Sequence, residues 1–297
     1  MRILLTGAAG FIGRNIAARL VNDGHEVIFF DRVLGNDLSD RETLNQNIAV
    51  SDVVIHLAAI ADLNYAREHP EETFKTNIQG TWNVAEYCAL YNKRLLYAST
   101  CCVYGDQDFE KYPETTEDSP PNPNEIYAYS KYVGEYLIRS FHFTHGLNYV
   151  NMRFPTTYGE PGMREALGVK LFLRQAIAKA PITVHGDGTQ TRTLTHISDL
   201  VEAVTRLVNR PDLNNFAINL STEESVSALD MAKVIKEVTG SESPITFIPQ
   251  RKGQTMKEAI RSYKAKELLG WEAKVSFKDG VQQCYDFLGK ERTLPQA

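Results

Sequence analysis

The sequence predicts an α/β fold: a doubly wound parallel sheet, followed by a smaller mixed α/β lobe at the C-terminal end. Short apolar runs alternate with amphipathic helical stretches over the first hundred residues, which is the pattern of βαβ units in a parallel sheet. The chain has 297 residues. That is about twice the length of a typical single domain, so we expect two lobes around a cleft.

The individual elements follow from these patterns. The first apolar run stops at Gly7, as a buried parallel strand would. The first helix follows because Ile16, Ala17 and Leu20 fall on one of its faces. We expect strands over residues 2–6, 26–30, 52–57 and 94–98, and helices over residues 12–22 and 77–91 and within 123–135.

The second half of the chain has a different character. After about Tyr149, loops rich in Gly, Pro and Thr interrupt the alternation of strands and helices. We therefore expect residues 1–150 to form the first domain. Residues 151–297 are expected to form mainly a substrate lobe, with some segments returning to the first domain.

Composition excludes several classes of protein. A net charge of −5 without a basic block argues against nucleic-acid binding. The four cysteines lack metal-ligand spacing, so we expect no metal site and free thiols in a reducing compartment. Met1 leads directly into a strand pattern, and no apolar run approaches the roughly 20 residues of a membrane span. We expect a cytoplasmic protein without a signal peptide.

The first chemical motif follows the first strand and opens the first helix. Residues 6–13 (TGAAGFIG) carry three glycines at intervals of three. Glycines let the backbone approach a pyrophosphate, and the helix N-terminus offers free N–H groups. A structural turn is the alternative, but the strand–turn–helix context favours a dinucleotide-binding Rossmann domain. The expected contacts are Gly7, Gly10, Phe11, Ile12 and Gly13.

Two charged residues bear on which dinucleotide binds. Asp31, at the end of the second strand, can accept hydrogen bonds from both adenosine ribose hydroxyls and would repel a 2′-phosphate. Its neighbour Arg32 could instead hold such a phosphate. We expect NAD as the cofactor, with both residues beside it.

The second motif is residues 127–131 (YAYSK). Residues four apart share a helix face, so Tyr127 and Lys131 can point into one cleft. A phenol of pKa about 10 is a poor acid–base at neutral pH, but a nearby ammonium and a positive nicotinamide both favour the phenolate. The spacing alone also occurs by chance in many helices, where a buried Tyr and a solvated Lys are the usual outcome.

With both motifs in this order, the chain resembles the extended short-chain dehydrogenases/reductases. It is most similar to their NAD-dependent nucleotide-sugar epimerase/dehydratase family, and within it to UDP-glucose 4-epimerases. The resemblance runs from Met1 to about residue 288. Further segments that carry it are residues 37–38 (DL), 56–59 (HLAA), 77–83 (NIQGTWN), 99–105 (STCCVYG), 153–159 (RFPTTYG), 186–192 (GDGTQTR) and 264–271 (KAKELLGW).

The resemblance implies roles for individual residues. Tyr127 would take the proton of a sugar hydroxyl while hydride passes to NAD, Lys131 would lower the Tyr127 pKa and hold the nicotinamide ribose, and Thr100 would share the same oxygen. Additional cofactor contacts would come from Asp37, Leu38, Leu57, Ala58, Ala59, Asn77, Ser99, Phe154 and Thr156. Tyr127 and Lys131 would also touch the cofactor.

Substrate contacts are implied in the same way. Arg192 and Arg251 match positions whose guanidinium groups hold the nucleotide diphosphate, as bidentate donors suit. Thr156 departs from the family pattern, where an Asn usually contacts substrate phosphate. Glu258 stands where a gating residue controls the size of the sugar, and it is neither the small nor the aromatic residue usual there. A UDP-sugar is the expected substrate, without a named sugar.

Two adjacent thiols are the informative departure. Dehydratases and decarboxylases of the family generally place Glu at the position of Cys102, and many 4,6-dehydratases place Asp at that of Cys101. Epimerases put small residues there. The favoured interpretation is therefore a C4 epimerase whose two thiols pack beside the nicotinamide and, with Thr100, line the substrate site. One thiolate acting as base in an unusual elimination is the sharper alternative.

Other functions stay open at this point. A dehydratase or 4-ketoreductase of the same family is the near alternative, and a non-catalytic NAD-sensing protein is a remote one, because tyrosine, lysine and hydroxyl are all present.

The resemblance also suggests a homodimer through the helices near residues 77–91 and 127–143. The tyrosines there, which could equally be scattered surface aromatics, are Tyr87, Tyr91, Tyr132 and Tyr136.

Overall fold

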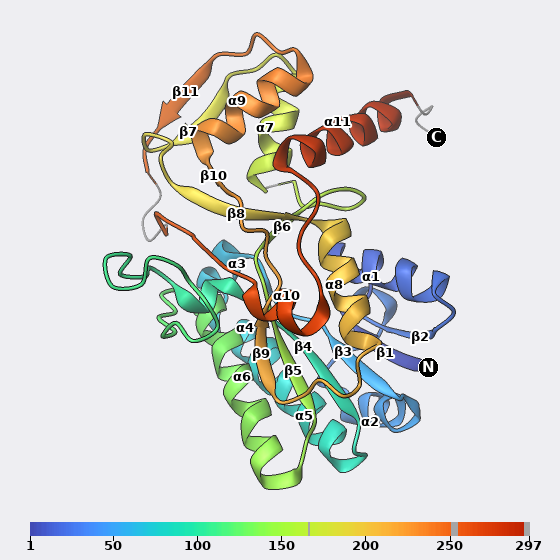
Figure 1. Cartoon of the computed structure of the whole chain (residues 1–297). Coiled ribbons are helices and arrows are strands. Elements are labelled where there is room, and N and C mark those ends of the chain that lie inside the picture. Colours follow the sequence, from blue (N-terminus) through green and yellow to red (C-terminus); the bar gives the residue numbers. More distant parts are fainter. Residues whose placement is uncertain (166, 251–254, 294–297) are drawn as a thin grey trace.

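A parallel sheet forms the centre of the protein (Figure 1). The computed structural model describes residues 1–165, 167–250 and 255–293. The central strands are β1 (Arg2–Thr6), β2 (Glu26–Phe30), β3 (Val53–His56), β4 (Arg94–Thr100), β5 (Tyr149–Phe154) and β9 (Phe216–Asn219). They pair in parallel in the order β2-β1-β3-β4-β5-β9. The predicted doubly wound α/β class is confirmed.

Helices cover both faces of this sheet. One layer contains α1 (Phe11–Asn22), α8 (Ile197–Val208) and α10 (Tyr263–Leu269), and the other contains α2 (Arg41–Val50), α5 (Gly80–Leu90) and α6 (Ile126–His145). Alternate residues of each strand supply the two cores. In β4, Leu96 and Ala98 pack toward α1 and α8, whereas Leu95 and Tyr97 pack toward α5 and α6. Burial on both faces explains why these strands are continuous apolar runs in the sequence.

Two predicted helices differ in their bounds. The helix expected over residues 77–91 is preceded by a π-helical segment, η2 (Phe74–Gln79), and becomes α-helical only at Gly80. The helix carrying Tyr127 begins at Ile126, so residues 123–125 lie outside it. Glu125, which precedes the helix, has an extended backbone with φ of −128° and ψ of 147°. Short elements between the main ones are η1 (Arg32–Leu34), α3 (Leu63–Glu68), α4 (Pro70–Thr73) and η3 (Cys101–Tyr104).

The remaining elements build a smaller unit above the carboxyl ends of the strands (Figure 1). A three-stranded sheet has the order β10-β8-β6, and a separate parallel pair joins β11 to β7. Their bounds are β6 (Thr156–Tyr158), β7 (Ile182–His185), β8 (Thr191–His196), β10 (Ser225–Ser227) and β11 (Ile245–Ile248). The helices packed with them are α7 (Gly168–Ile177), α9 (Ala228–Thr239) and α11 (Phe277–Thr293).

The expected boundary at residue 150 falls inside β5, which is a full member of the central sheet. From the second half of the chain, β9, α8 and α10 also lie in the layers of that sheet.

Within the described ranges, no helix combines the length and the apolar character needed to cross a membrane.

The strand order places a crevice at one point of the sheet. From β1 the chain goes to β2 on one side and then returns to β3 on the other side of β1. At such a reversal the loops after neighbouring strands separate, and ligands bind outside the carboxyl ends of the strands. The glycine turn after β1 and residues 57–59 after β3 meet at this point.

Candidate active site

The glycine turn is packed backbone against backbone. Gly7 has a φ of +73°, and a Cβ there would lie 2.7 Å from the amide nitrogen of Ala58. A Cβ on Gly13 would lie 2.1 Å from the carbonyl oxygen of Gly7. Gly10 caps α1 without a side-chain hydrogen bond, so the first amides of the helix are left for a ligand. This cradle fits the pyrophosphate of a dinucleotide.

Asp31 is fixed beside this turn. Its Oδ2 accepts a hydrogen bond from the Ala9 amide at 3.0 Å, and its Oδ1 accepts one from the Val33 amide at 3.0 Å. The neighbouring Arg32 is exposed, and its Nη1 lies 3.2 Å from Glu72 Oε1. The carboxylate therefore faces the turn, while the guanidinium has an anionic partner of its own.

A buried amide holds the segment after β3. Asn77 is fully buried; its Oδ1 accepts from the Ile60 amide at 2.8 Å, and its Nδ2 donates to the Ile60 carbonyl at 3.0 Å and to Ser130 Oγ at 2.9 Å. These contacts use the amide's oxygen and both of its donor hydrogens. The structure thus supports a positioning role for Asn77, connecting residues 57–60 to α6. A direct contact of Asn77 with the cofactor stays a prediction.

The three expected catalytic residues come together where β4 ends and α6 begins. Thr100 is the last residue of β4, and its Oγ1 accepts from the Cys102 amide at 3.2 Å. Tyr127 stands in the first turn of α6. Burial raises the pKa of its phenol, whereas a hydrogen bond with Thr100 acts to lower it.

Lys131 lies one helical turn further along α6. Its side chain is buried, and Nζ lies 4.4 Å from the centre of the Tyr97 ring. Burial lowers the pKa of Lys131 to about 7, and the Glu135 carboxylate acts in the opposite direction. The ammonium is therefore held in a site where a further negative charge, such as a phenolate, would stabilise it.

The two adjacent thiols differ in exposure. Cys101 is buried and its Sγ donates to the Arg153 carbonyl at 3.4 Å, whereas Cys102 is exposed as a residue although protein groups surround its thiol. Desolvation by the surrounding protein, followed by the charge of Glu258, raises the pKa of both thiols. Both are therefore neutral thiols at pH 7 in this environment.

Arg192 and Glu258 form a pair beside these thiols. Nε of Arg192 lies 3.4 Å from Glu258 Oε1, and its Nη1 donates to the Thr255 carbonyl at 2.8 Å. Glu258 Oε2 accepts from the Thr193 amide at 3.2 Å, and burial raises the pKa of its carboxyl group. The other expected diphosphate ligand, Arg251, lies outside the described residues.

The remaining expected cofactor residues are distributed around the crevice. Ser99, Phe154 and Leu38 are buried, and Leu38 packs against Gly80. Asp37 is exposed, with Oδ1 accepting from the Ser39 amide at 2.8 Å. Residues 57–59 and Thr156 are half-buried in the segments that follow β3 and β5. Contact of these residues with a cofactor stays a prediction.

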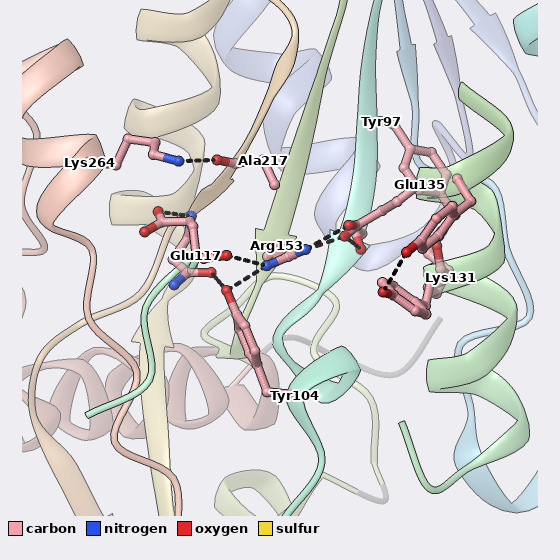
Figure 2. A network of polar contacts seen from close by, with 12 residues as sticks. Tyr97, Tyr104, Glu117, Lys131, Glu135, Arg153, Ala217 and Lys264 are labelled. Carbon is pink, nitrogen blue, oxygen red and sulfur yellow. Dashed lines mark hydrogen bonds and ion pairs between the residues drawn. The ribbon is translucent and has the colours of Figure 1, made fainter. Parts of the chain in front are cut away.

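Sequence reasoning missed a buried polar network behind the site, shown in Figure 2. Arg153 and Glu135 form a buried ion pair, with Nη2 2.7 Å from Oε2. The signal available in the sequence was the position of Glu135, four residues after Lys131 on the same helix face. The identity of its partner depends on how α6 packs on β5, which the sequence pattern does not specify.

Comparison with known proteins identifies the family. The NAD dependent epimerase/dehydratase family matches residues 3–220. This chain belongs to that family. The predicted resemblance and the NAD-dependent class of enzyme are thereby confirmed.

Members with related sequences carry more than one activity in their names. A UDP-glucuronic acid decarboxylase of Danio rerio is 31% identical, over 98% of this chain and 73% of that protein. An uncharacterized UDP-glucose epimerase of Bacillus subtilis is 30% identical, over 95% of this chain and 96% of that protein. The crystal structure of a UDP-glucuronic acid 4-epimerase from Bacillus cereus, with UDP-glucuronic acid and NAD, superimposes with a TM-score of 0.89 at 27% identity. The superposition covers 98% of this chain and 100% of the other.

Proposed function

We propose that this protein is an NAD-dependent nucleotide-sugar epimerase that oxidises and re-reduces C4 of an NDP-hexose through a 4-keto intermediate. The observation that carries the proposal is the grouping of Thr100, Tyr127 and Lys131 beside two neutral thiols, where an elimination enzyme of the family would need a carboxylate. Epimerisation needs no group beyond these three and the cofactor.

The chain's own residues divide the work at C4. NAD supplies the acceptor and later the donor of the hydride when bound. Tyr127 Oη takes the proton of the C4 hydroxyl and returns it after the sugar has presented its other face. Thr100 donates a hydrogen bond to the same oxygen, and Lys131 stabilises the phenolate by its charge. The glycine turn and Asp31 hold the pyrophosphate and the adenosine ribose.

The nucleotide-sugar end of the site is proposed from its charges. Arg192 lies beside the thiols with one face bound to backbone carbonyls, and Arg251 follows in the same part of the chain as Glu258. Two guanidinium groups suit a diphosphate. UDP-sugars are the favoured class, because the related enzymes of Danio rerio, Bacillus subtilis and Bacillus cereus are named for UDP-sugars.

One observation favours a second candidate, an elimination or decarboxylation. Glu258 provides a carboxyl group whose charge acts on Cys101 and Cys102, and burial raises its pKa. A carboxyl group with a raised pKa can serve as an acid–base near neutral pH. In that case Glu258 would supply the function that Cys102 lacks.

The test is a panel of UDP-, dTDP-, GDP- and CDP-sugars in deuterated water. For an epimerase we expect a product of unchanged mass without deuterium at C5. Cys101→Ser, Cys102→Ala and Glu258→Gln should each keep activity within about tenfold, because proton and hydride bypass these groups. Tyr127→Phe should abolish turnover and still bind NAD.

The opposite result is equally distinct. A product lighter by water or carbon dioxide, with solvent deuterium on the ring, would assign the chemistry to elimination or decarboxylation. Loss of about 10²–10⁴-fold in Cys102→Ala or Glu258→Gln would then identify the base. Failure of every sugar in the panel, with NAD bound, would return the non-catalytic alternative.

We also propose a homodimer formed by α5 and α6. Large apolar side chains stay exposed along both helices, among them Trp82, Leu90, Tyr129, Tyr136 and Phe143. Of the tyrosines expected there, Tyr91 and Tyr136 are exposed, whereas Tyr87 and Tyr132 are half-buried.

The four free cysteines support a reducing compartment, consistent with the expected cytoplasmic location.

A further inference from the structure

A buried ion pair lies between the catalytic helix and the sheet (Figure 2). Glu135 Oε1 accepts from Arg153 Nε at 3.0 Å, and Oε2 accepts from Nη2 at 2.7 Å. Ser99, which pairs with Arg153 across β4 and β5, donates its hydroxyl to Glu135 Oε1. The two charged side chains are only 6% and 7% exposed. Removing such ions from water carries a large free-energy penalty, so an apolar contact would hold the helix on the sheet at lower cost.

This pair contacts both segments that carry the catalytic residues. Glu135 follows Lys131 by one helical turn on the same face of α6. On the other side, Arg153 Nη1 donates to Tyr104 Oη at 2.8 Å, and its guanidinium carbon lies 4.9 Å from the centre of that ring. Tyr104 ends η3, which directly follows Thr100. Thr100 and Lys131 are thus connected through Tyr104, Arg153 and Glu135.

We propose that Glu135 is a positioning residue of the active site, which favours the ammonium form of Lys131 and, through Arg153, fixes the helix of Lys131 to the segment of Thr100. Arg153 serves in turn as the buried counterion of Glu135. The inference rests on the proposed function and deepens it, because it names the group that favours a cation at the buried lysine beside Tyr127.

The other titratable groups described around Lys131 carry no negative charge that could favour its ammonium form. On β4, burial keeps the pKa of the Tyr97 phenol well above its ordinary value, so its ring contributes no charge. On β3, burial and then Lys131 itself lower the pKa of His56 to about 3, so it is neutral. Tyr127 on α6 is neutral without a cofactor, since burial raises its pKa. Among these described neighbours, Glu135 is the group that bears negative charge, and it opposes the effect of burial on Lys131.

The experiment compares Glu135→Gln with the wild-type protein, both of full length and loaded with NAD. Glutamine keeps the shape and removes the charge, leaving the Arg153 cation without its carboxylate partner. We expect the titration midpoint of Lys131 to fall by about one pH unit or more. The readout is the ¹³Cε resonance of ¹³C-lysine-labelled protein, assigned by its loss in Lys131→Arg. The alkaline limb of the pH–rate profile should shift in the same direction, because the ammonium is lost at lower pH.

A second buried pair provides the matched control. Lys170 Nζ lies 2.8 Å from Glu160 Oε1, and these side chains are 8% and 3% exposed. Glu160→Gln removes an equally buried carboxylate and should lower stability without moving the Lys131 midpoint. The double variant Glu135→Gln/Arg153→Met leaves no unpaired ion, so it preserves the test if the single variant does not fold. Its midpoint should also lie below that of the wild type.

The outcomes separate this inference from the proposed function. An unchanged Lys131 midpoint in a folded Glu135 variant, with turnover reduced equally at every pH, would overturn the inference and leave a structural role only. A lowered midpoint in Glu135→Gln, unchanged in Glu160→Gln, upholds it. If that shift occurs while the wild type turns over no nucleotide sugar, the positioning role stands and the proposed function fails.

Discussion

Lys131 is the residue at which burial and function oppose each other most directly. Its ordinary pKa near 10.4 falls to about 7 inside the protein, since desolvation outweighs the attraction of Glu135. Such a charge costs stability, and the gain is a cation placed where Tyr127 must lose a proton. Active sites commonly retain groups of this kind at the expense of folding free energy.

Lys131→Met should therefore stabilise the NAD-free protein. Between pH 7 and pH 10 the unfolded chain holds a proton on this lysine that the folded chain has released, so wild-type stability rises with pH across that range. Below pH 7 the full cost of burying the charge remains. We expect the variant to gain about 2–4 kcal/mol there, after the lost contact with Tyr97, and progressively less toward pH 10.

Chemical denaturation at pH 6.5 and pH 10 measures this difference. Lys233→Met is the control, because Lys233 is exposed and pairs with the exposed Asp230. Its unfolding free energy should stay within about 0.5 kcal/mol of the wild type at both pH values. Equal unfolding free energies of Lys131→Met and the wild type at pH 6.5 would contradict this prediction. They would mean that burying the Lys131 ammonium carries no net cost in stability.

Asp31 should make the protein prefer NAD to NADP. Its carboxylate is held at the glycine turn by two amides, while Arg32 is drawn toward Glu72. A 2′-phosphate would meet the carboxylate, so NAD should bind at least about tenfold more tightly than NADP. Fluorescence titration with both dinucleotides measures the ratio. Equal affinities in the wild type that separate in Arg32→Gln would show that Arg32 compensates for the carboxylate.

At the scale of elements, the sequence predicted the strands and turns whose formation depends on local residue patterns. The strands of the central sheet are apolar runs because both faces are buried, and the glycine turn must follow β1 for steric reasons. The three-residue strands β6 and β10 gave no comparable signal, being too short to show a period. The Glu135–Arg153 pair was not predictable for a different reason. It depends on the rotation of α6 over β5, which is set by tertiary packing.

Gly134 shows how closely α6 approaches the sheet. A Cβ at this position would lie 2.3 Å from the Tyr97 hydroxyl oxygen, which donates to the Lys131 carbonyl at 3.3 Å. Gly134→Ala should push the helix away from β4, destabilise the protein by about 1–3 kcal/mol and reduce turnover more than NAD affinity. The displacement acts on Lys131 and Tyr127, whereas the glycine turn lies on other elements.

A matched glycine tests this reasoning by thermal unfolding and kinetics. In α11, a Cβ on Gly289 would meet nothing within 4 Å. Gly289→Ala should therefore leave turnover unchanged and gain up to about 1 kcal/mol from helix propensity alone. Wild-type activity and stability in Gly134→Ala would show that α6 is free to shift, and would weaken the argument that its position sets the catalytic geometry.

At the scale of the whole molecule, the site lies where two assemblies meet. The central sheet supplies the glycine turn, Thr100 and the helix of Tyr127, and the smaller unit supplies Arg192 and Glu258 from β8 and the segment after β11. The parallel order of the sheet requires that these carboxyl-end loops share one edge. The outer surface of α5 and α6 is turned away from this edge and keeps its aromatic side chains exposed.

The outer surface of α5 and α6 should bind a second copy of the chain, because an exposed apolar face on two adjacent helices suits such an interface. The wild type should sediment at twice the mass of one chain. Tyr136→Glu places a charge at a position 56% exposed in one chain, so the monomer should fold while burial of the charge opposes pairing. Phe247→Glu is the control, since Phe247 is equally exposed, 56%, but belongs to β11. Sedimentation velocity over a range of concentrations should show a monomer for the first variant and a dimer for the second. A dimer that persists in Tyr136→Glu, or a monomeric wild type, would remove α5 and α6 as the interface.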